Sequence, residues 1–252
     1  MKIRFLFVFL FISGFALAQE KREASSATLP KAQVFESKQT VTIDGKVINL
    51  NAKAGTMELK DENNRPIALY GFTAYFKENP EKNRPIVFAY NGGPGSSSYW
   101  LHMGIMGPKR IVVNDPNYNQ AAPYELANNE FSILDVADVV MMDPVGTGLS
   151  IPIGEAKGAD FWGVDQDIRS TSLFIMQFLK EHGRLNSPKY ILWESYGTFR
   201  NAGVMNYLLD KGYAAKIRAT IDPAKAAVSK ELNPGTAPHE GTNTTHYSIV
   251  DK

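Results

Sequence analysis

Hydrophobic and polar residues alternate along the first third of the chain. In residues 41–51 the alternation reverses around Asp44-Gly45, a dipeptide favoured in two-residue hairpin turns, so this stretch predicts an antiparallel β-hairpin. The alternation continues at 56–60 and, after the polar turn Asn63-Asn64-Arg65-Pro66, at 67–76. The chain therefore begins with a set of β-strands.

Short, continuous apolar runs follow at 86–90, 136–142 and 190–193. Such runs are typical of strands buried on both faces of a parallel sheet. Between the last two runs, residues 161–182 place apolar side chains at helical spacing with charges opposite, which predicts an amphipathic helix. Residues 201–209 predict another helix. This alternation of strands and helices favours an α/β fold with a mostly parallel sheet, preceded by antiparallel β-hairpins.

The first residues are typical of a cleaved signal peptide. Lys2 and Arg4 precede an apolar run at 5–15, and Ala16-Leu17-Ala18 has the small-x-small pattern of a cleavage site. The run is shorter than the roughly 20 residues that cross a bilayer, which disfavours a membrane anchor. We expect residues 1–18 to direct secretion or export to the periplasm, with no membrane association after cleavage. Residues 19–35 are polar and small, and predict a flexible leader before the domain.

Composition excludes several classes of function. The chain has 27 Lys and Arg against 26 Asp and Glu, so no excess charge favours nucleic acid. It has no Cys, which excludes disulfides, thiol nucleophiles and thiolate metal sites. No two of its four histidines have a familiar metal-ligand spacing, and we expect neither a metal nor a cofactor.

Two glycine-rich turns follow buried strands. Residues 91–98 (NGGPGSSS) let the backbone turn sharply, and the exposed N–H groups of such a loop bind anions or oxyanions, although an ordinary loop has the same composition. The loop lacks the Lys of a phosphate-binding loop and the spacing of a dinucleotide fingerprint. The second turn, 193–198 (WESYGT), places Ser195 between a strand and a helix, as in the nucleophile elbow of hydrolases.

Together with residues 143–150 (DPVGTGLS), these turns resemble the secreted serine carboxypeptidase family, in its bacterial branch, over about residues 36–210. The resemblance implies an α/β-hydrolase fold, incomplete in this chain. It also implies peptide substrates, and removal of their C-terminal residues by a Ser-His-Asp triad without a metal.

The resemblance assigns a role to each residue of the two turns. Ser195 would be the nucleophile, and the backbone N–H groups of Gly93 and Tyr196 would bind the oxyanion. The residues that would bind the terminal carboxylate of the substrate are Asn91, Gly92 and Glu194. Since two carboxylates repel at hydrogen-bond distance unless one is protonated, Glu194 would bind in its protonated form, favouring acidic pH.

The sequence departs from the family at two points. Trp193 stands where the family elbow has a glycine, so the turn must rearrange locally or the serine is displaced. The triad Asp and His of the family lie farther beyond the serine than this sequence extends. His102 and His182 precede the serine, and His239 and His246 lie in a polar tail.

Two functions remain open at this point. The first is a serine-type carboxypeptidase whose triad Asp and His are missing from this chain. The alternative is an inactive product of truncation or gene fusion that retains at most peptide-carboxylate binding. An extracellular binding module has no motif in its favour.

Residues 212–252 resemble a different family, the γ-glutamyltransferases, at their subunit junction. In that family the chain cleaves itself before a threonine that becomes the nucleophile, and the matching residue is Thr244, after Asn243. The segment is polar and interrupted by Pro and Gly, so we expect a mostly disordered tail foreign to the carboxypeptidase domain.

We predict that the bond between Asn243 and Thr244 stays intact. Self-cleavage needs a folded scaffold that positions the threonine hydroxyl, and residues 244–252 do not supply one. Intact-mass measurement of the purified protein tests this prediction. A species ending at Asn243 without added protease would contradict it and favour the γ-glutamyltransferase class.

Overall fold

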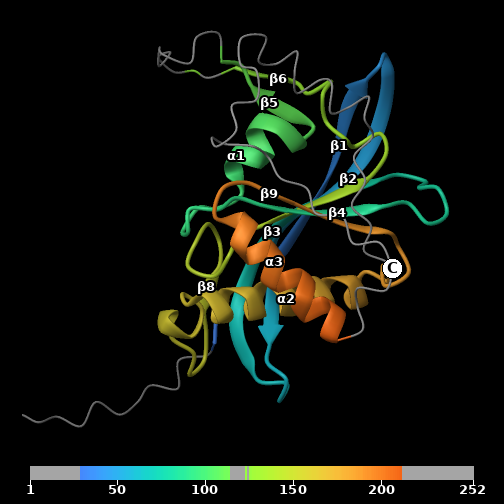
Figure 1. Ribbon diagram of the computed structural model, residues 1–252. Coiled ribbons are helices and arrows are strands. Elements are labelled where there is room, and N and C mark those ends of the chain that lie inside the picture. The colour runs from blue at the N-terminus through green and yellow to red at the C-terminus, as the bar shows by residue number, and fades with distance from the viewer. Residues whose placement is uncertain (1–28, 114–122, 124, 212–252) are drawn as a thin grey trace, which may run out of the picture. The chain divides into compact units, whose positions relative to one another are not determined.

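The computed structural model describes residues 29–113, 123 and 125–211, and all its helices and strands lie in the compact unit 31–252. Its main feature is a 7-stranded mixed sheet with the order β1-β2-β3-β7-β4-β9, in which β8 pairs with β3 (Figure 1). The strands of this sheet are β1 (Val34–Ile43), β2 (Lys46–Lys60), β3 (Pro66–Lys77), β4 (Ile86–Tyr90), β7 (Asp138–Met142), β8 (Ile151–Pro152) and β9 (Lys189–Trp193). A separate two-stranded sheet pairs β5 (Lys109–Ile111) with β6 (Leu126–Asn128).

The helices lie between and after these strands in the chain. α1 (Tyr99–Leu101) and a π-helical turn η1 (His102–Met106) come after β4, and the short helix η2 (Gly158–Asp160) precedes α2. The two long helices are α2 (Val164–Glu181) and α3 (Gly197–Asp210), which confirms the helices predicted at 161–182 and 201–209.

The predicted hairpin is confirmed. β1 and β2 pair from Ile43 and Lys46 outward, and both turn residues, Asp44 (φ 49°) and Gly45 (φ 72°), have the positive φ that such a turn requires. β2 also continues through 52–55, where the polarity pattern predicts no strand. A Cβ on Gly55 would lie 2.0 Å from the carbonyl oxygen of Gln33, so only glycine permits the hydrogen bond from Thr56 N to that oxygen (2.8 Å).

The three apolar runs are parallel neighbours, as predicted. β4 lies between β7 and β9, and it pairs with both in parallel. The sheet as a whole is mixed rather than mostly parallel, because β1, β2, β3, β7 and β8 pair antiparallel. β9 ends the order of the described strands instead of lying in the centre. The apolar sequence of β9 therefore reflects burial of the faces of the strand. It does not indicate whether the strand is paired on one edge or on both.

The sheet has a hydrophobic core on each face. α2 and α3 cover one face (Figure 1). There Phe174 stacks on Tyr70 (ring centroids 4.3 Å apart), and Phe178 lies edge-on to Phe72 (5.3 Å). On the other face, Leu101 and Met106 pack with alternate residues of the same strands. Burial on both faces explains why β4 and β7 are buried at every position.

A buried ionic cluster joins the amino-terminal ends of the parallel strands. Asp138 is 1% exposed, and its carboxylate accepts hydrogen bonds from Arg84 Nε (2.9 Å) and from the Arg184 guanidinium. Arg84 also donates to the carbonyl oxygens of Leu134 and Ala137 (2.7 and 2.9 Å). Since every charge in the cluster is paired, its burial is tolerated, and losing one partner would leave a charge without compensation.

Several sequence predictions fall outside the described residues. These are the signal peptide at 1–18, most of the leader at 19–35, and the tail at 212–252 with Thr244, His239 and His246. β1 begins at Val34, just before the domain boundary expected at 36. Within the described ranges, no helix has the length and apolar character needed to cross a membrane.

The pairing of His102 with Tyr75 predicts an acid-sensitive stability. His102 Nε2 lies 2.6 Å from Tyr75 Oη, and burial lowers the pKa of His102 and raises the pKa of Tyr75 to about 12. The unfolded histidine takes up a proton near pH 6.5, whereas the folded one resists it, so the free energy of unfolding should fall as pH drops below about 6.5. Urea unfolding at about pH 7.5 and 5.5 measures this difference.

The matched variant is His102→Gln, which keeps a hydrogen-bonding group beside Tyr75 without titrating. Its free energy of unfolding should depend less on pH than that of the wild type. Burial lowers the pKa of His182 as well, so part of the dependence should remain. Equal pH dependence in variant and wild type would contradict the prediction.

Candidate active site

Residues of the candidate site lie where parallel strands end. Asn91 directly follows β4, Asp143 follows β7, and Glu194 and Ser195 follow β9. Because carboxyl ends of parallel strands meet at one edge of the sheet, the fold brings together turns that are far apart in sequence.

Ser195 occupies a strained strand-to-helix turn. Its φ is 56°, a left-handed value that is uncommon for any residue with a side chain, and the residue is exposed. Hydrogen bonds from Gly197 N to Glu194 O and from Thr198 N to Ser195 O (both 3.0 Å) close the turn into α3. An exposed serine on such a turn is the geometry of a nucleophile elbow.

The turn accommodates Trp193 without losing this geometry. The indole is 2% exposed, belongs to the core under α2 and α3, and donates from Nε1 to Thr198 Oγ1 (3.1 Å). A Cβ on Gly197 would lie 2.7 Å from the Cβ of Trp193, closer than real contacts allow. The glycine absent at 193 is therefore compensated by the glycine retained at 197, and the local rearrangement expected from the sequence is a hydrogen-bonded, buried indole.

The glycine-rich loop touches the elbow. A Cβ on Gly92 would lie 2.4 Å from the backbone nitrogen of Tyr196 and 2.5 Å from the carbonyl oxygen of Glu194. Only glycine allows this approach. The next residue, Gly93, has a φ of 114°, which also favours glycine. The two predicted oxyanion donors, Gly93 and Tyr196, therefore both lie beside the close approach of Gly92 to the elbow.

Asn91 links the loop to Glu194. Its side chain is 1% exposed, its Nδ2 donates to Glu194 Oε2 (3.3 Å), and its Oδ1 accepts from Leu101 N (3.1 Å). These bonds fix the orientation of the amide. All the residues predicted from the two turns therefore meet at one place: Asn91, Gly92, Gly93, Glu194, Ser195 and Tyr196.

Arg200 is a residue of this region that the sequence analysis missed. It is 1% exposed, and its Nε donates to Asp167 Oδ2 (2.7 Å) while another guanidinium nitrogen donates to the carbonyl oxygen of Asn91 (3.0 Å). The guanidinium also lies over the rings of Tyr90 and Tyr196 (5.1 and 5.5 Å). Burial raises the pKa of Asp167, and the charge of Arg200 opposes that rise.

The sequence contains one indication that Asp167 and Arg200 form a buried pair. Asp167 lies on the apolar face of α2, in a row that includes Phe174 and Phe178. A carboxylate in a buried row needs a cationic partner. The sequence does not show which of the 27 Lys and Arg supplies it.

Asp143 links the segment 143–150 to the glycine-rich loop. Its Oδ1 accepts from Ser98 N (2.9 Å), and a Cβ on Gly148 would lie 2.0 Å from its Oδ2. Burial raises the pKa of this carboxyl, and the backbone hydrogen bonds from Ser98 and Leu149 oppose the rise. The residue braces the two turns against each other.

Neither histidine within the described ranges is paired with Ser195. His102 is bonded to Tyr75, and His182 stacks on Phe178 (ring centroids 4.0 Å apart) with Nδ1 3.1 Å from the carbonyl oxygen of Phe178. Among the same residues, no group of three or more His, Asp or Glu side chains is arranged to hold a metal ion.

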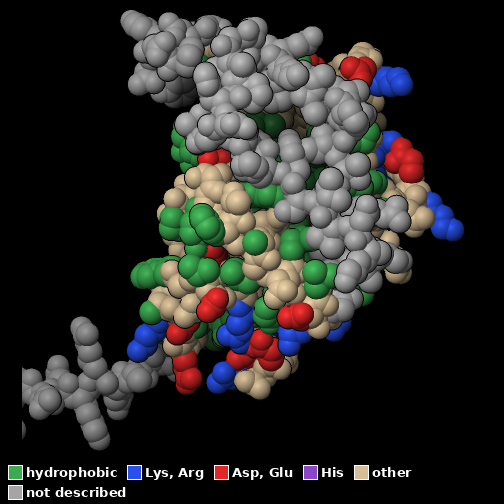
Figure 2. All heavy atoms as spheres, in the orientation of Figure 1, with side chains coloured by type: hydrophobic (Ala, Val, Ile, Leu, Met, Phe, Trp, Pro, Cys, Tyr) green, Lys and Arg blue, Asp and Glu red, His purple; other side chains and the backbone are tan. Residues whose placement is uncertain are grey.

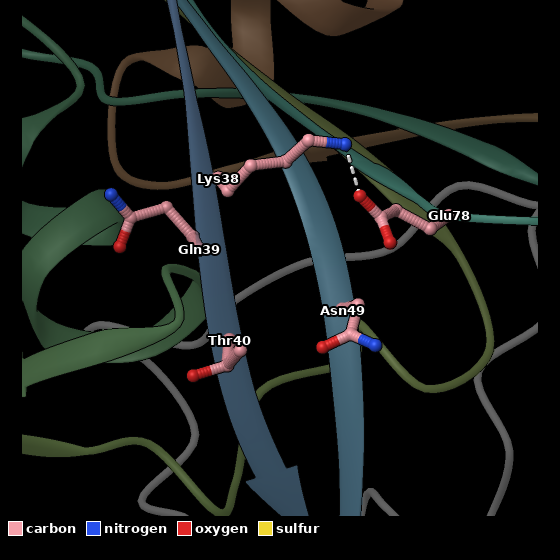
Figure 3. Close-up of a pocket in the computed structure, with 5 residues that line it drawn as sticks. All are labelled: Lys38, Gln39, Thr40, Asn49 and Glu78. Atoms are coloured by element: carbon pink, nitrogen blue, oxygen red, sulfur yellow. Dashed lines mark hydrogen bonds and ion pairs between the residues drawn. The ribbon is translucent and has the colours of Figure 1, made fainter.

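A surface hollow of about 440 Å³ lies elsewhere, on the β1–β2 hairpin (Figure 3). It is lined by Lys38, Gln39, Thr40, Asn49 and Glu78. β1 and β9 are the two ends of the sheet order, so this hollow is separated from the elbow by the strands between them. Because it is open and contains no nucleophile held in a strained turn, we place the candidate site at the elbow.

The strained serine lies on a strand-to-helix turn beside a glycine-rich loop, which makes Ser195 the candidate nucleophile of this site. A comparison with protein families identifies the group: the model of the family described as serine carboxypeptidase matches residues 43–216. The chain belongs to the serine carboxypeptidase family.

Curated relatives agree with this membership. Serine carboxypeptidase-like 49 of Arabidopsis thaliana is 32% identical over 128 residues, which are 50% of this chain and 22% of that protein. A pheromone-processing carboxypeptidase of Clavispora lusitaniae is 34% identical over 133 residues, 52% of this chain and 17% of that protein. The chain thus spans about a fifth of the length of these relatives.

The second resemblance is also confirmed. The glutathione hydrolase proenzyme of Pseudomonas sp. (strain A14) is 72% identical over 46 residues, which are 18% of this chain and 8% of that protein. The chain therefore combines a carboxypeptidase-like part with a short segment similar to a γ-glutamyltransferase proenzyme.

The contact between Trp193 and Gly197 predicts a strong coupling between the two positions. We expect Gly197→Ala to lower the free energy of unfolding by about 1–3 kcal/mol, the usual cost of overpacking, although alanine favours helices. In a Trp193→Gly background the same substitution should cost much less, because the opposing Cβ is gone. Urea denaturation of the single and double variants measures the coupling.

Gly104→Ala is the control for this cycle, since a Cβ there meets nothing within 4 Å. It should leave stability nearly unchanged. Equal effects of Gly197→Ala in both backgrounds would show that the Trp193 contact does not restrict this position.

Proposed function

We propose that this chain carries the nucleophile half of a serine-type carboxypeptidase site on an α/β-hydrolase fold. The observation that carries the proposal is the positive φ of Ser195 beside the contact between Gly92 and Tyr196 N. In the proposed reaction Ser195 Oγ attacks the last peptide carbonyl, and the N–H groups of Gly93 and Tyr196 donate to the oxygen as it becomes negative.

The neighbouring side chains suit a free terminal carboxylate. Asn91 Nδ2 is fixed towards Glu194, so an amide donor and a carboxyl group are already paired beside the nucleophile. In the proposal, protonated Glu194 and Asn91 donate to the substrate carboxylate, and the N–H of Gly92 assists. Such a site selects peptides with a free C-terminus.

Covalent chemistry also requires a base that removes the Ser195 proton and an acid that orients the base. Among the described residues, His102 and His182 are engaged with Tyr75 and with the carbonyl oxygen of Phe178. Since no base is paired with Ser195 among the described residues, we propose that this chain binds peptides by their terminal carboxylate and hydrolyses their last peptide bond slowly. The alternative, a fused or truncated product that only binds, rests on the same observation and differs in having no turnover.

The proposal also includes export. The sequence of residues 1–18 is typical of a signal peptide, and a peptidase of this kind would act on peptides outside the cytoplasm.

Labelling with a fluorophosphonate probe tests the nucleophile. Loss of triad function typically slows catalysis by about a million-fold, so we expect slow labelling of the wild type and none of Ser195→Ala. Rapid, stoichiometric labelling that Ser195→Ala abolishes would show that a base is present. Labelling that persists in Ser195→Ala would contradict Ser195 as the nucleophile.

Calorimetry with a blocked dipeptide tests the binding half separately. In the Ser195→Ala variant we expect binding of the free acid and loss of binding for the amide of the same dipeptide. Glu194→Gln should keep the preference for the free acid, since its amide retains a donor for the carboxylate. Equal affinity for acid and amide would contradict the carboxylate site.

A further inference from the structure

The outer edge of β1 is exposed at one end of the sheet order. Among the described strands β1 pairs only with β2, in an unbroken antiparallel register. At Thr42 this edge is covered, because the side chain of Asn128 accepts from Thr42 N and donates to Thr42 O (both 2.8 Å), as a neighbouring strand would. Asn128 therefore shows which residues of β1 direct their backbone groups outward.

Backbone groups alternate in direction along an antiparallel strand. Since Thr42 faces outward, the N–H and C=O groups of Val34, Glu36, Lys38 and Thr40 face outward too. No proline or bulge interrupts residues 34–40, and all of these residues except Gln39 are exposed. Sheet edges of this kind pair with further strands unless they are blocked.

We propose that two copies of this chain pair through their β1 edges, antiparallel, with the two Ser37 residues facing each other across the two-fold axis. In this arrangement Glu36 of one copy lies opposite Lys38 of the other, twice by symmetry. Val34 lies opposite Thr40, so all outward-facing residues from 34 to 40 pair.

Charge and chain geometry select this register over its neighbours. A shift that centres the pairing on Glu36 places two carboxylates opposite each other, and one that centres it on Lys38 places two ammonium groups together. The second shift also places Val34 opposite Thr42, a position already occupied by Asn128. In the proposed register the pairing ends at Val34, where β1 itself begins.

Both charged side chains have partners in the single copy and remain exposed: Glu36 pairs with Lys53 (2.8 Å), and Lys38 extends across β2 to Asn51 (2.6 Å) and Glu78 (Figure 3). In the proposed dimer these two ion pairs of each copy face those of the other with opposite charges adjacent. Phe35, which is 71% exposed, would lie opposite Gln39 of the second copy and become covered. The pairing thus gives a partner to a large aromatic side chain that the single copy leaves in water.

Charge reversal tests the pairing in the full chain. Glu36→Lys alone places a second ammonium group opposite Lys38, Lys38→Glu alone places a second carboxylate opposite Glu36, and both variants should be monomeric by light scattering. A mixture of the two variants restores opposite charges in both pairs, so its mass should rise towards about twice that of the monomer. A monomeric wild type at about 0.1 mM, or a mixture that stays monomeric, would overturn the proposal.

Cysteine trapping tests the register, and the absence of native cysteine makes the result specific. Ser37→Cys should form a disulfide-linked dimer on mild oxidation, because facing Cα atoms at such a position lie about 4.5 Å apart. Gln39→Cys alone should not, since its copies would be about 13 Å apart. A mixture of Phe35→Cys and Gln39→Cys should cross-link. A dimer that Ser37→Cys does not trap would place the interface elsewhere and overturn the proposal.

Discussion

The buried ion pair between Arg200 and Asp167 holds the candidate site together. Arg200 projects from α3, Asp167 from α2, and the carbonyl oxygen of Asn91, which also binds the guanidinium, ends β4. One side chain therefore sets the distance between the elbow helix and the strand end that carries the glycine-rich loop. Loss of one member of such a buried pair costs about 3–5 kcal/mol, because the other charge is left without a partner.

The elbow keeps its geometry with a tryptophan at position 193, because glycines at two other positions leave room for it. Trp193 places a large indole where the strand meets the helix, yet Ser195 keeps its positive φ. The indole packs into the core and donates to Thr198, while Gly197 and Gly92 leave space for the two backbone segments to approach. Close backbone contact, not the residue at one position, maintains the strained serine.

The buried ionic cluster and the candidate site lie at opposite ends of the parallel strands. The amino ends carry the Asp138 cluster with Arg84 and Arg184, and the carboxyl ends carry the serine and the loop.

Figure 2 shows hydrophobic side chains on the surface of the side where α3 lies in Figure 1, and Phe199 and Leu209 of α3 are 71% and 43% exposed. α3 thus exposes more apolar surface than a solvated helix requires.

The sequence alone determined the local elements and the chemistry of the two turns. Asp44-Gly45 specified the hairpin, the three apolar runs specified the parallel strands, and NGGPG and WESYG specified a loop and a serine turn. These features depend on neighbouring residues, on turn conformation and on periodicity, all of which are written locally in the chain. The resemblance to serine carboxypeptidases followed from the same short motifs.

Only the tertiary structure decided the pairings between distant residues. It showed that the sheet is mixed, that β9 ends the described order, and that Arg200 is the cation for Asp167. It also showed that Gly197 compensates for Trp193 and that Asn128 covers Thr42. Each of these depends on segments separated by a turn or by many residues, and hydrophobic patterning records that a residue is buried but not which residue lies opposite it.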